Sequence, residues 1–427
     1  MHAMIIGAGL AGLTCARELD RHGVDVTLIE ASNGVGGRVR TDYVDGYTLD
    51  RGFQVLFDAY PAVQRQLDLT ALDLQPFEPG AIICFEGQRI VLTDPLRDPD
   101  LKARLQATID MRISPFDKLR TLLLALELKS QTIGQMLTGP DTSSLNYLRQ
   151  RGFSERFIDL FFRPFYGGIL FDRALQTSAK CLKFDFKMLA EGQTAVPLHG
   201  MGEISEQLAR PLMQRGRIRL NTRAERIFSA GDGTHIYLVG GETLQPDVIV
   251  LATSAPEVER LSGEPMPTGA KQTATIYLNG DQRFYSAKKL VLNANPDAYI
   301  NNAQLLTNVN PAYAPVGKHL LSAVTIGIPT ITDTQLYRAV LTDLHAMFAG
   351  DIKAQAALAT YQPLAIYRIP YAQFDQPPGL HARLPDNRTQ LQGVYLAGEY
   401  TEASSLNAAM VSGEKCAVAI IKDLRMY

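Results

Sequence analysis

The first thirty residues limit the fold of this chain more strongly than any other stretch. A short apolar run, HAMIIG, is followed by a helical pattern that places Ala11, Cys15 and Leu19 on one face. A second apolar run, VDVTLIE, comes next. Strand, helix and strand in this order form two parallel neighbours in a sheet. The sequence therefore predicts an α/β protein with a doubly wound, Rossmann-type sheet.

Three glycines, Gly7, Gly9 and Gly12, stand between the first strand and the helix. The first allows a tight turn, the second lets backbone approach a pyrophosphate, and the third lets the helix pack closely on the strand. The helix start offers free N–H groups and the positive end of the helix dipole. Glu30, at the end of the second strand, can accept both ribose hydroxyls of an adenosine and would repel a 2′-phosphate. We predict a dinucleotide site that disfavours NADP.

A second glycine turn follows directly after Glu30, in the stretch EASNGVGGRVRT. It contains Ala31, Gly36, Gly37 and Arg38, and it can fold back over the same pyrophosphate. Arg38 can then make charge-assisted contacts to phosphate. An NAD site does not need this second clamp, whereas the longer FAD uses it. The sequence therefore predicts FAD as the cofactor.

Two further stretches are candidates for contact with the same ligand. In LDRGFQVL, Gly52 and Phe53 form a turn that could bring backbone beneath a flat ring, although a turn in the core fits equally well. Near the other end, the strand-like GVYLAG leads to Gly398 and Glu399, and a small-residue helix then begins. We predict a bare helix start there. The candidate residues on this helix are Leu406, Asn407, Ala409 and Met410.

Composition and charge exclude several classes of function. Lys and Arg number 42 against 44 Asp and Glu, so no basic surplus indicates nucleic-acid binding. The four cysteines are far apart and the histidines are scattered, so we predict neither a disulfide framework nor a metal site. A strand beginning by residue 3 leaves no room for a leader ahead of it, and no apolar run approaches the ~18 residues of a membrane span. We expect a cytoplasmic protein.

The length of 427 residues predicts more than one lobe. We predict that residues 1–80, 190–255 and 389–427 build one discontinuous FAD-binding domain. Residues 81–189 and 256–388 would form a second, α+β substrate domain, with a helical insertion and a sheet. Such interrupted connectivity places a ligand crevice between the lobes.

The stretches IIGAGLAGL, LIEASNGVGGR and VYLAGEYTEASSLNAAMVSG together resemble the flavin amine oxidase and phytoene desaturase superfamily of FAD-dependent oxidoreductases. PFYGGI and PLHGMGEI are similar to its desaturase and protoporphyrinogen oxidase branch. The resemblance implies that Gly7, Gly9, Gly12, Glu30, Gly37 and Arg38 hold the ADP half of FAD. It also implies adenine contact by the strand at Ala224.

For the other half of the cofactor, the resemblance implies that Gly398 and Glu399 lie near the pyrophosphate and the ribityl chain. Asp is usual in the family where this chain has Glu399. Residues 406–410 would lie at the flavin ring, where a helix N-terminus stabilises the negative charge of the reduced flavin. Small residues there let the ring come close.

The substrate is indicated by one residue in particular. Amine oxidases of the family place an aromatic ring where this chain has Leu406, and the chain has no Trp. Tyr367 and Tyr371 could still supply rings from another strand. We predict hydride transfer from a largely apolar, conjugated small molecule to flavin N5. The alternatives are an amine oxidase that produces hydrogen peroxide and a non-redox, flavin-dependent polyene isomerase.

The middle of the chain carries much apolar bulk. We interpret most aromatic residues between 157 and 171 as core, with a tunnel for an apolar substrate as the alternative. FDKLRTLLLALELK is interpreted as a buried core helix, and peripheral contact with a membrane is the alternative. Arg368 either orients a substrate or makes a structural salt bridge. No catalytic residue beyond the flavin is predicted, and the oligomeric state and electron acceptor are left open.

Overall fold

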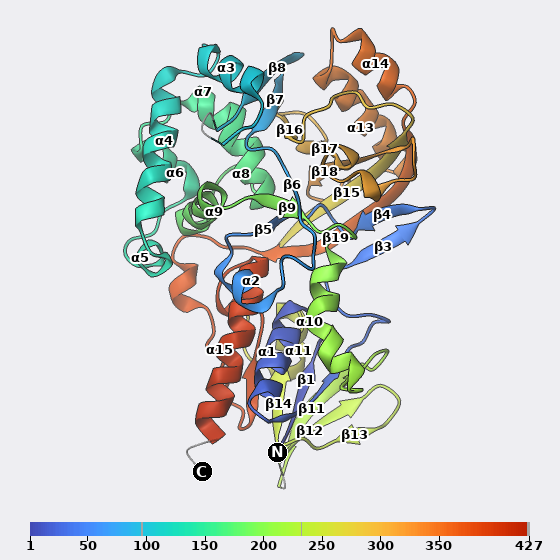
Figure 1. The fold of residues 1–427 in the computed structure, drawn as a ribbon. Helices are drawn as coiled ribbons and strands as arrows, with labels where there is room; N and C mark the ends of the chain where they lie inside the picture. Colours follow the sequence, from blue (N-terminus) through green and yellow to red (C-terminus); the bar gives the residue numbers. More distant parts are fainter. Residues whose placement is uncertain (95–96, 232, 425–427) are drawn as a thin grey trace.

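A five-stranded parallel sheet forms the lower part of the molecule in Figure 1. The computed structural model describes residues 1–94, 97–231 and 233–424. The strands follow the order β10 (Ile218–Arg219), β2 (Asp25–Ile29), β1 (His2–Ile6), β14 (Val248–Leu251) and β20 (Val394–Leu396). Every neighbouring pair is parallel, and α1 (Leu10–Arg21) connects β1 to β2. The predicted strand–helix–strand opening is confirmed.

Alternating residues of β1 point to two different layers, as the two-residue period of a strand requires. Ala3 and Ile5 are buried with the helices α1, α10 (Gly202–Gln214) and α15 (Leu406–Leu424). Met4 and Ile6 are buried on the other face. That face is covered by a small antiparallel sheet and a helix, namely β11 (Ala224–Ala230), β12 (Gly233–Leu238), β13 (Thr243–Leu244) and α11 (Ala255–Ser262).

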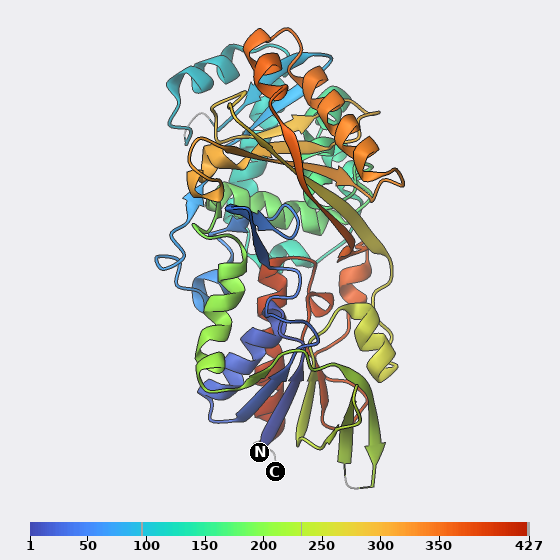
Figure 2. The same ribbon diagram turned by 90° about the vertical axis from the view of Figure 1, so that its right-hand side faces the viewer.

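The five parallel strands come from segments that are far apart in the sequence, and all five lie within the three segments predicted for the first domain. Figure 2 shows the first and last parts of the chain lying side by side in this layer. The exact domain limits stay a prediction.

A seven-stranded mixed sheet forms the second lobe. Its order is β19 (Gln362–Phe374), β15 (Ala270–Gly280), β18 (His319–Ile326), β17 (Asn302–Leu305), β16 (Leu290–Asn293), β7 (Ala81–Phe85) and β8 (Gln88–Leu92). The helices α13 (Asp333–Met347) and α14 (Ile352–Leu358) cover one face. The sequence analysis did not identify α14, which is only two turns long.

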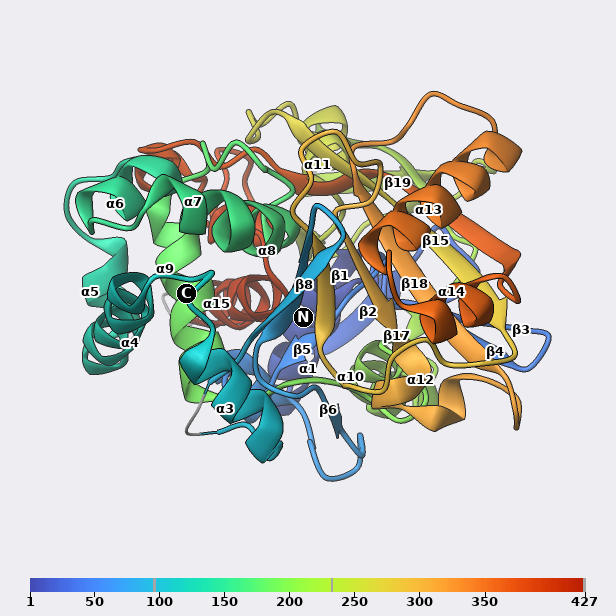
Figure 3. The same ribbon diagram turned by 90° about the horizontal axis from the view of Figure 1, so that it is seen from above.

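A helical lobe lies against the β7–β16 end of the other face, on the opposite side from α13 and α14 (Figure 3). It comprises α3 (Leu101–Ile109), α4 (Pro115–Ser130), α5 (Ile133–Leu137), α6 (Ser144–Gln150), α7 (Glu155–Phe157), a π-helical turn (Ile158–Phe162), α8 (Arg163–Ile169) and α9 (Ala179–Glu191). The aromatic residues Phe157, Phe161, Phe162 and Tyr166 are buried there together. This agrees with their interpretation as core.

The interpretation of α4 as a buried core helix is wrong. Only Leu124 and Leu128 among its apolar side chains are buried. Five large apolar side chains face solvent instead, namely Phe116, Leu119, Leu122, Leu123 and Leu126. The composition of the helix indicated burial, but its neighbours cover only one narrow stripe of it.

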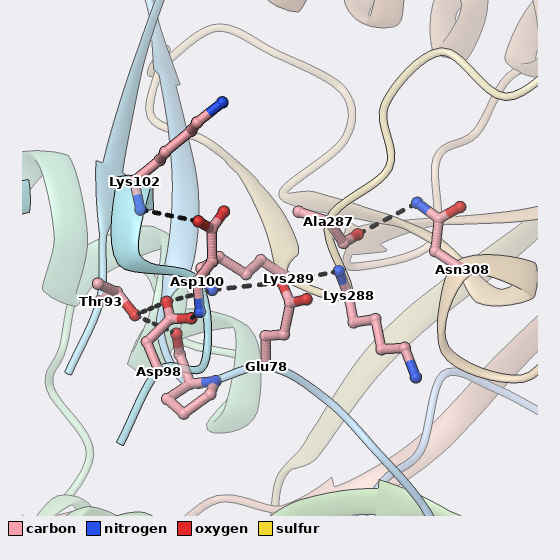
Figure 4. A network of polar contacts seen from close by, with 10 residues as sticks. Glu78, Thr93, Asp98, Asp100, Lys102, Ala287, Lys288, Lys289 and Asn308 are labelled. Atoms are coloured by element: carbon pink, nitrogen blue, oxygen red, sulfur yellow. Dashed lines mark hydrogen bonds and ion pairs between the residues drawn. The ribbon is translucent and has the colours of Figure 1, made fainter. Parts of the chain in front are cut away.

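A buried ion pair joins the start of the helical lobe to the large sheet (Figure 4). Lys289, in the loop just before β16, lies 2.6 Å from Asp98, and both side chains are almost fully buried. Lys289 also reaches Glu78 at 3.3 Å, and the Thr93 hydroxyl donates to Asp98. Because each charge has a partner, the attraction between them and their hydrogen bonds offset the desolvation cost of burying the pair.

The remaining elements are short and lie mostly between the lobes. They are β3 (Thr41–Val44), β4 (Tyr47–Asp50), β5 (Leu56–Phe57), β6 (Gln75–Pro76), β9 (Thr194–Val196), α2 (Pro61–Gln66), α12 (Leu306–Val309) and the 3₁₀ turns Pro311–Tyr313, Leu380–Arg383 and Glu399–Thr401. In Figure 1, α2 lies beside the upper end of α15 and below α9. Among the described residues, no helix is both long and apolar enough to cross a membrane.

Candidate functional site

The first glycine turn has the shape that phosphate binding requires. Gly7 has φ +108°, and a Cβ there would lie 2.6 Å from the carbonyl oxygen of Ala252. A Cβ on Gly12 would lie 2.1 Å from the carbonyl oxygen of Gly7. A Cβ on Gly9, by contrast, would meet nothing within 4 Å. Two glycines therefore permit the packing of α1, and the third leaves space in front of the helix.

The second glycine turn lies directly against the first. Gly36 donates its backbone N–H to the carbonyl oxygen of Ala8 at 2.8 Å, and Gly9 and Gly36 form a short parallel bridge. Gly37 also approaches closely, because its Cβ position would be 3.6 Å from the Cα of Gly9. The start of α1 has no side-chain cap among the described residues. The two turns thus frame an open helix N-terminus, which suits a pyrophosphate.

Glu30 is held in a fixed orientation at the end of β2. Its Oε2 accepts the N–H of Ala8 and its Oε1 accepts the N–H of Ser32, both at 2.9 Å. A carboxylate has about four lone-pair positions, so further acceptor capacity remains. Glu30, Ala31 and Ala224 line a cavity of about 280 Å³, together with Ile6, Gly7, Ile29, Thr222, Arg223, Thr253, Ser254 and Glu257. The residues predicted to hold adenosine therefore surround one space.

A larger cavity, of about 470 Å³, lies elsewhere, between the 33–41 loop and α10. None of the predicted cofactor-binding residues lines it. We therefore do not assign the cofactor to it.

Arg38 makes a contact that the sequence analysis missed. Its Nη1 lies 2.6 Å from Oε1 of Glu399 and donates to the carbonyl oxygen of Ala372 at 2.7 Å. Its guanidinium also lies over the ring of Tyr371. Burial acts to lower the pKa of Arg38, but the charge of Glu399 and its hydrogen bond outweigh that effect and raise it. The sequence did contain a signal for this contact, because Arg38 and Glu399 carry opposite charges and both were predicted to lie at the same ligand.

Gly398 and Glu399 are fixed by serines of the same C-terminal segment. Gly398 donates its N–H to the Ser412 hydroxyl at 2.9 Å, and Ser404 donates to Oε2 of Glu399 at 2.6 Å. A Cβ on Gly398 would collide with the ring of Tyr400. The Gly-acid pair therefore lies in a tightly packed turn, with the carboxylate shared between Arg38 and Ser404.

Ser405 caps the start of α15. The Ser405 hydroxyl accepts the N–H of Ala408 at 3.0 Å, and its carbonyl oxygen accepts the N–H of Ala409. Asn407 is buried, and its Oδ1 accepts the N–H of Ala62 at 3.0 Å. The side chain of Met410 is fully buried in the core. Asn407 and Met410 thus fix the helix, while the half-buried Leu406 and Ala409 remain near the surface of the site.

Small residues of α15 serve the packing of α1 as well. A Cβ on Gly413 would lie 2.4 Å from the carbonyl oxygen of Ala11 and 2.9 Å from Cβ of Thr14. This close approach brings the N-terminal and C-terminal cofactor motifs onto one rigid pair of helices. Ala11, predicted as a site residue, lies at this helix contact.

The turn at Gly52 and Phe53 lies where the two lobes meet. Gly52 has φ +106°, and a Cβ there would lie 2.6 Å from Cδ1 of Ile369 on β19. Phe53 donates its N–H to the Thr275 hydroxyl on β15 at 3.0 Å. The turn is thus fixed to the large sheet.

The two tyrosines of β19 do not form a facing pair. Tyr367 donates its hydroxyl to Asp42 at 2.9 Å and packs edge-on against Tyr277. Tyr371 lies instead beside Arg38. The described residues show no ring contact between Tyr367 and Tyr371. Arg368 forms an ion pair with Asp333 at 2.5 Å near the surface, which is the structural salt bridge that the sequence allowed.

The family model for flavin-containing amine oxidoreductases matches residues 10–421 of this chain. The chain belongs to this family. It is therefore a flavin-dependent oxidoreductase with FAD as its cofactor, and the resemblance drawn from the glycine and C-terminal motifs is confirmed. The open helix start, the two glycine turns and the Glu30 cavity fit that cofactor.

Relatives of this flavin-dependent oxidoreductase include the 15-cis-phytoene desaturase of Glycine max, which is 23% identical over 99% of this chain and 80% of the relative. A solved structure from Exiguobacterium sp. 255-15, provisionally named a protoporphyrinogen oxidase, has a TM-score of 0.74 at 20% identity and covers 99% of both chains. Wild-type putrescine oxidase bound to putrescine has a TM-score of 0.71 at 18% identity, again over 99% of both chains. These structural similarities confirm the fold.

Proposed function

We propose that this enzyme dehydrogenates a largely apolar, conjugated small molecule of the kind on which phytoene desaturases act. Leu406 is the observation that carries the proposal. It begins α15, where the family's amine oxidases place an aromatic ring, and it is aliphatic. Tyr367 is held by its hydrogen bond to Asp42 and packs edge-on against Tyr277. The whole-length similarity to a phytoene desaturase supports the same conclusion.

Bound FAD supplies the hydride acceptor for such a reaction. The chain's own part is to bind the cofactor at the glycine turns and Glu30, and to hold the substrate in a place from which water is excluded.

The test is anaerobic reduction of the holoenzyme's flavin, followed by absorbance. We expect 15-cis-phytoene in detergent micelles to bleach the flavin, and putrescine and cyclohexylamine to leave it oxidised. Rapid bleaching by an amine would support the amine oxidase instead. If neither class bleaches the flavin but the prereduced enzyme converts a cis polyene into its trans isomer, the enzyme is a non-redox isomerase.

We further infer that the enzyme contacts a membrane through an α3–α4 apolar surface. We define this surface by the exposed residues Leu101, Leu105, Ile109, Met111, Phe116, Leu119, Leu122, Leu123 and Leu126. Isolated exposed apolar residues are normal, but a concentration of large ones marks an interaction site. Residues 101–130 also carry six basic side chains against three acidic ones, which suits anionic lipid headgroups.

A membrane contact fits the proposed substrate, because an apolar polyene dissolves in the bilayer and not in water. The test is cosedimentation of the holoenzyme with vesicles, some of neutral phosphatidylcholine and some with added phosphatidylglycerol. We expect binding to both and tighter binding to the anionic vesicles. A protein that stays in the supernatant with both would overturn the membrane proposal and leave the substrate proposal intact.

A further inference from the structure

The cavity of about 470 Å³ between the 33–41 loop and α10 is separate from the Glu30 cavity that fits the adenosine of FAD. Its volume falls within the range of about 300–1,000 Å³ that small-molecule sites occupy. Its lining combines charged, amide and apolar side chains from segments that are far apart in the sequence. The cavity therefore has room for a small molecule other than FAD.

Arg40 supplies a guanidinium group that the 33–41 loop holds in place. Its Nη2 donates to Oδ1 of Asn33 at 3.0 Å, and its Nη1 donates to the Ser32 hydroxyl at 3.3 Å. A Cβ on Gly34 would lie 2.9 Å from Nη2, so the lack of a side chain there lets the guanidinium lie against the loop backbone. In the part of the chain that the structure describes, Arg40 forms no ion pair. Its charge is thus oriented but not neutralised by a bound carboxylate.

Arg210 supplies a second guanidinium group from the α10 side of the cavity. It is exposed, and within residues 1–94, 97–231 and 233–424 its side chain makes neither a hydrogen bond nor an ion pair. Glu206, one helical turn earlier, lines the same cavity. An acid and a base at this spacing can pair on a helix, but these two side chains are not paired. Two arginines and one glutamate leave one net positive charge in the lining.

The apolar part of the lining comes from Val35, Met213 and Leu220. Met213 is 50% exposed, which is unusual for a large apolar side chain without a partner on its face. It lies in the last turn of α10, where the helix dipole places partial negative charge and disfavours an anion. An anionic group is therefore favoured at the two arginines, and an apolar group is favoured at Met213 and Leu220.

The cavity shares its loop wall with the second glycine turn. The loop residues that line it lie on both sides of residues 36–38. The start of α10 holds the same loop, because the Ser205 hydroxyl donates to the carbonyl oxygen of Val39 at 2.9 Å and Gly202 donates its N–H to the Thr41 hydroxyl at 2.8 Å. A ligand that bridges the loop and α10 would strengthen the contact that holds this turn at the FAD site.

We propose that this cavity binds a monocarboxylate with a short apolar chain, and that the bound anion strengthens FAD binding. The carboxylate lies between Arg40 and Arg210, which both keep unused N–H donors. The single net charge of the lining matches a monoanion, and Glu206 repels a dianion such as phosphate. The apolar chain lies against Met213 and Leu220. This site does not depend on which substrate the enzyme oxidises.

The first test is calorimetric titration of the FAD-loaded enzyme with sodium octanoate, with octanol and with inorganic phosphate. Octanol lacks the charge of octanoate, and phosphate lacks its apolar chain. We expect octanoate to bind at least about tenfold more tightly than either, on the scale of hydrogen bonds to a charged group.

Three variants locate the bound octanoate. Arg210→Gln should weaken its binding at least about tenfold, because a guanidinium–carboxylate contact is lost. Glu206→Gln should strengthen its binding, because a competing negative charge is removed. Arg215→Gln is the matched control and should bind octanoate like the wild type, since Arg215 directly follows α10, pairs with Asp20 and does not line the cavity. Opposite changes in the first two variants cannot come from a general loss of folding.

The effect on the cofactor is measured by titrating the apoprotein with FAD, with and without saturating octanoate. Flavin fluorescence reports the binding. We expect octanoate to raise the FAD affinity at least about fivefold in the wild type and in Arg215→Gln, and to leave it unchanged in Arg210→Gln. Because linkage is reciprocal, the holoenzyme should bind octanoate more tightly than the apoprotein by the same factor.

Four results would contradict the proposal. Equal binding of octanol and octanoate would show that the arginines do not recognise the carboxylate, and tighter binding of phosphate would exclude a monocarboxylate as the preferred ligand. Octanoate binding that neither Arg210→Gln nor Glu206→Gln changes would place the ligand elsewhere, for example on the α3–α4 apolar surface. Binding that Arg210→Gln weakens, without any effect of octanoate on FAD affinity, would overturn the coupling to the cofactor.

Discussion

Arg38 and Glu399 form an ion pair, with 2.6 Å between Nη1 and Oε1, that joins the second glycine turn to the C-terminal Gly-acid motif. Two segments from opposite ends of the chain are thus fixed to each other by charge. Glu399 is only 8% exposed at its side chain, whereas Arg38 remains 41% exposed. The carboxylate depends on the arginine more than the arginine depends on the carboxylate.

This asymmetry predicts different costs for removing each partner. Arg38→Met should lower the free energy of unfolding of the apoprotein by about 1–3 kcal/mol, because the buried carboxylate of Glu399 loses its ion-pair partner. Glu399→Gln should cost less, because Arg38 keeps Ala372 and water. Urea denaturation of both single variants and the double variant measures the coupling. Equal costs for the two single variants would contradict the proposed asymmetry.

Glu30→Ala should weaken FAD binding by roughly 1.5–3 kcal/mol, the scale of hydrogen bonds to a charged group. The measurement is a titration of apoprotein with FAD, followed by quenching of flavin fluorescence. Glu225→Ala is a matched control, because Glu225 is an exposed residue of the neighbouring strand β11. Unchanged affinity in Glu30→Ala would remove the carboxylate from the cofactor site.

Substitutions at two glycines of the first turn should distinguish an effect on folding from an effect on FAD binding. Gly9→Ala adds a Cβ into open space at φ −77°, so stability should change by less than about 1 kcal/mol while FAD affinity falls at least tenfold. Gly12→Ala forces a Cβ to 2.1 Å from the Gly7 carbonyl oxygen and should destabilise the fold itself. Thermal unfolding of the apoproteins and FAD titration distinguish the two effects. Normal FAD binding by Gly9→Ala would argue against a phosphate in front of this helix.

The α3–α4 apolar surface predicts a vesicle-binding phenotype without a folding phenotype. Replacing both Leu122 and Leu123 by Glu should weaken vesicle binding at least tenfold, because each buried CH₂ contributes about 0.8 kcal/mol. Thermal stability should not fall, since both side chains are exposed. Val418→Glu, on the exposed side of α15, is the control and should bind vesicles like the wild type. If the control lost vesicle binding equally, the effect would come from added negative charge and not from the loss of this apolar surface.

Removing Lys289 from its ion pair with Asp98 should lower the free energy of unfolding by an amount that depends on pH. Burial acts to raise the pKa of Asp98, but the hydrogen bonds from Lys289 and Thr93 outweigh it and lower the pKa. Its stabilisation is therefore fully present above the unfolded pKa of about 4 and is lost as pH falls through the lowered value. Lys289→Met should cost about 3–5 kcal/mol at neutral pH, because it leaves a buried charge unpaired.

That cost should shrink on acidification, as the unpaired Asp98 carboxyl becomes protonated. Denaturant unfolding at neutral and acidic pH measures the change. Lys102→Met is the control, since its ammonium group makes no contact in this network (Figure 4). A cost that stays constant with pH would mean that the variant acts through packing alone.

Local sequence signals predicted the cofactor motifs well. The spacing of Gly7, Gly9 and Gly12 indicates one backbone turn. A Cβ on Gly12 would collide with Gly7 inside that turn, and a Cβ on Gly9 would occupy the space expected for the ligand. The atom that excludes a Cβ at Gly7, the carbonyl oxygen of Ala252, lies outside the turn. The fold-back of Gly36 and Gly37 could also be predicted, since both turns were expected at the same pyrophosphate. What the sequence could not predict was pairing between distant side chains, such as Arg38 with Glu399.

One error has a clear physical origin. The α4 helix was interpreted as core from its leucines. Burial depends on which neighbours cover a helix, and composition does not contain that information. The serine at 405 was visible, but its role as a cap depends on the backbone angle at which the chain enters the helix.

The sequence by itself determined the parallel sheet, the two glycine turns and the FAD cofactor, because these follow from short-range spacing and from the steric limits of single residues. Only the tertiary structure decided which charges pair, which apolar face of α4 stays exposed, and that Asp185 is buried in the helical lobe. Those features arise where segments far apart in the chain meet. The burial and the electrostatic environment of a residue depend on which distant segments pack against it, so no local sequence pattern specifies them.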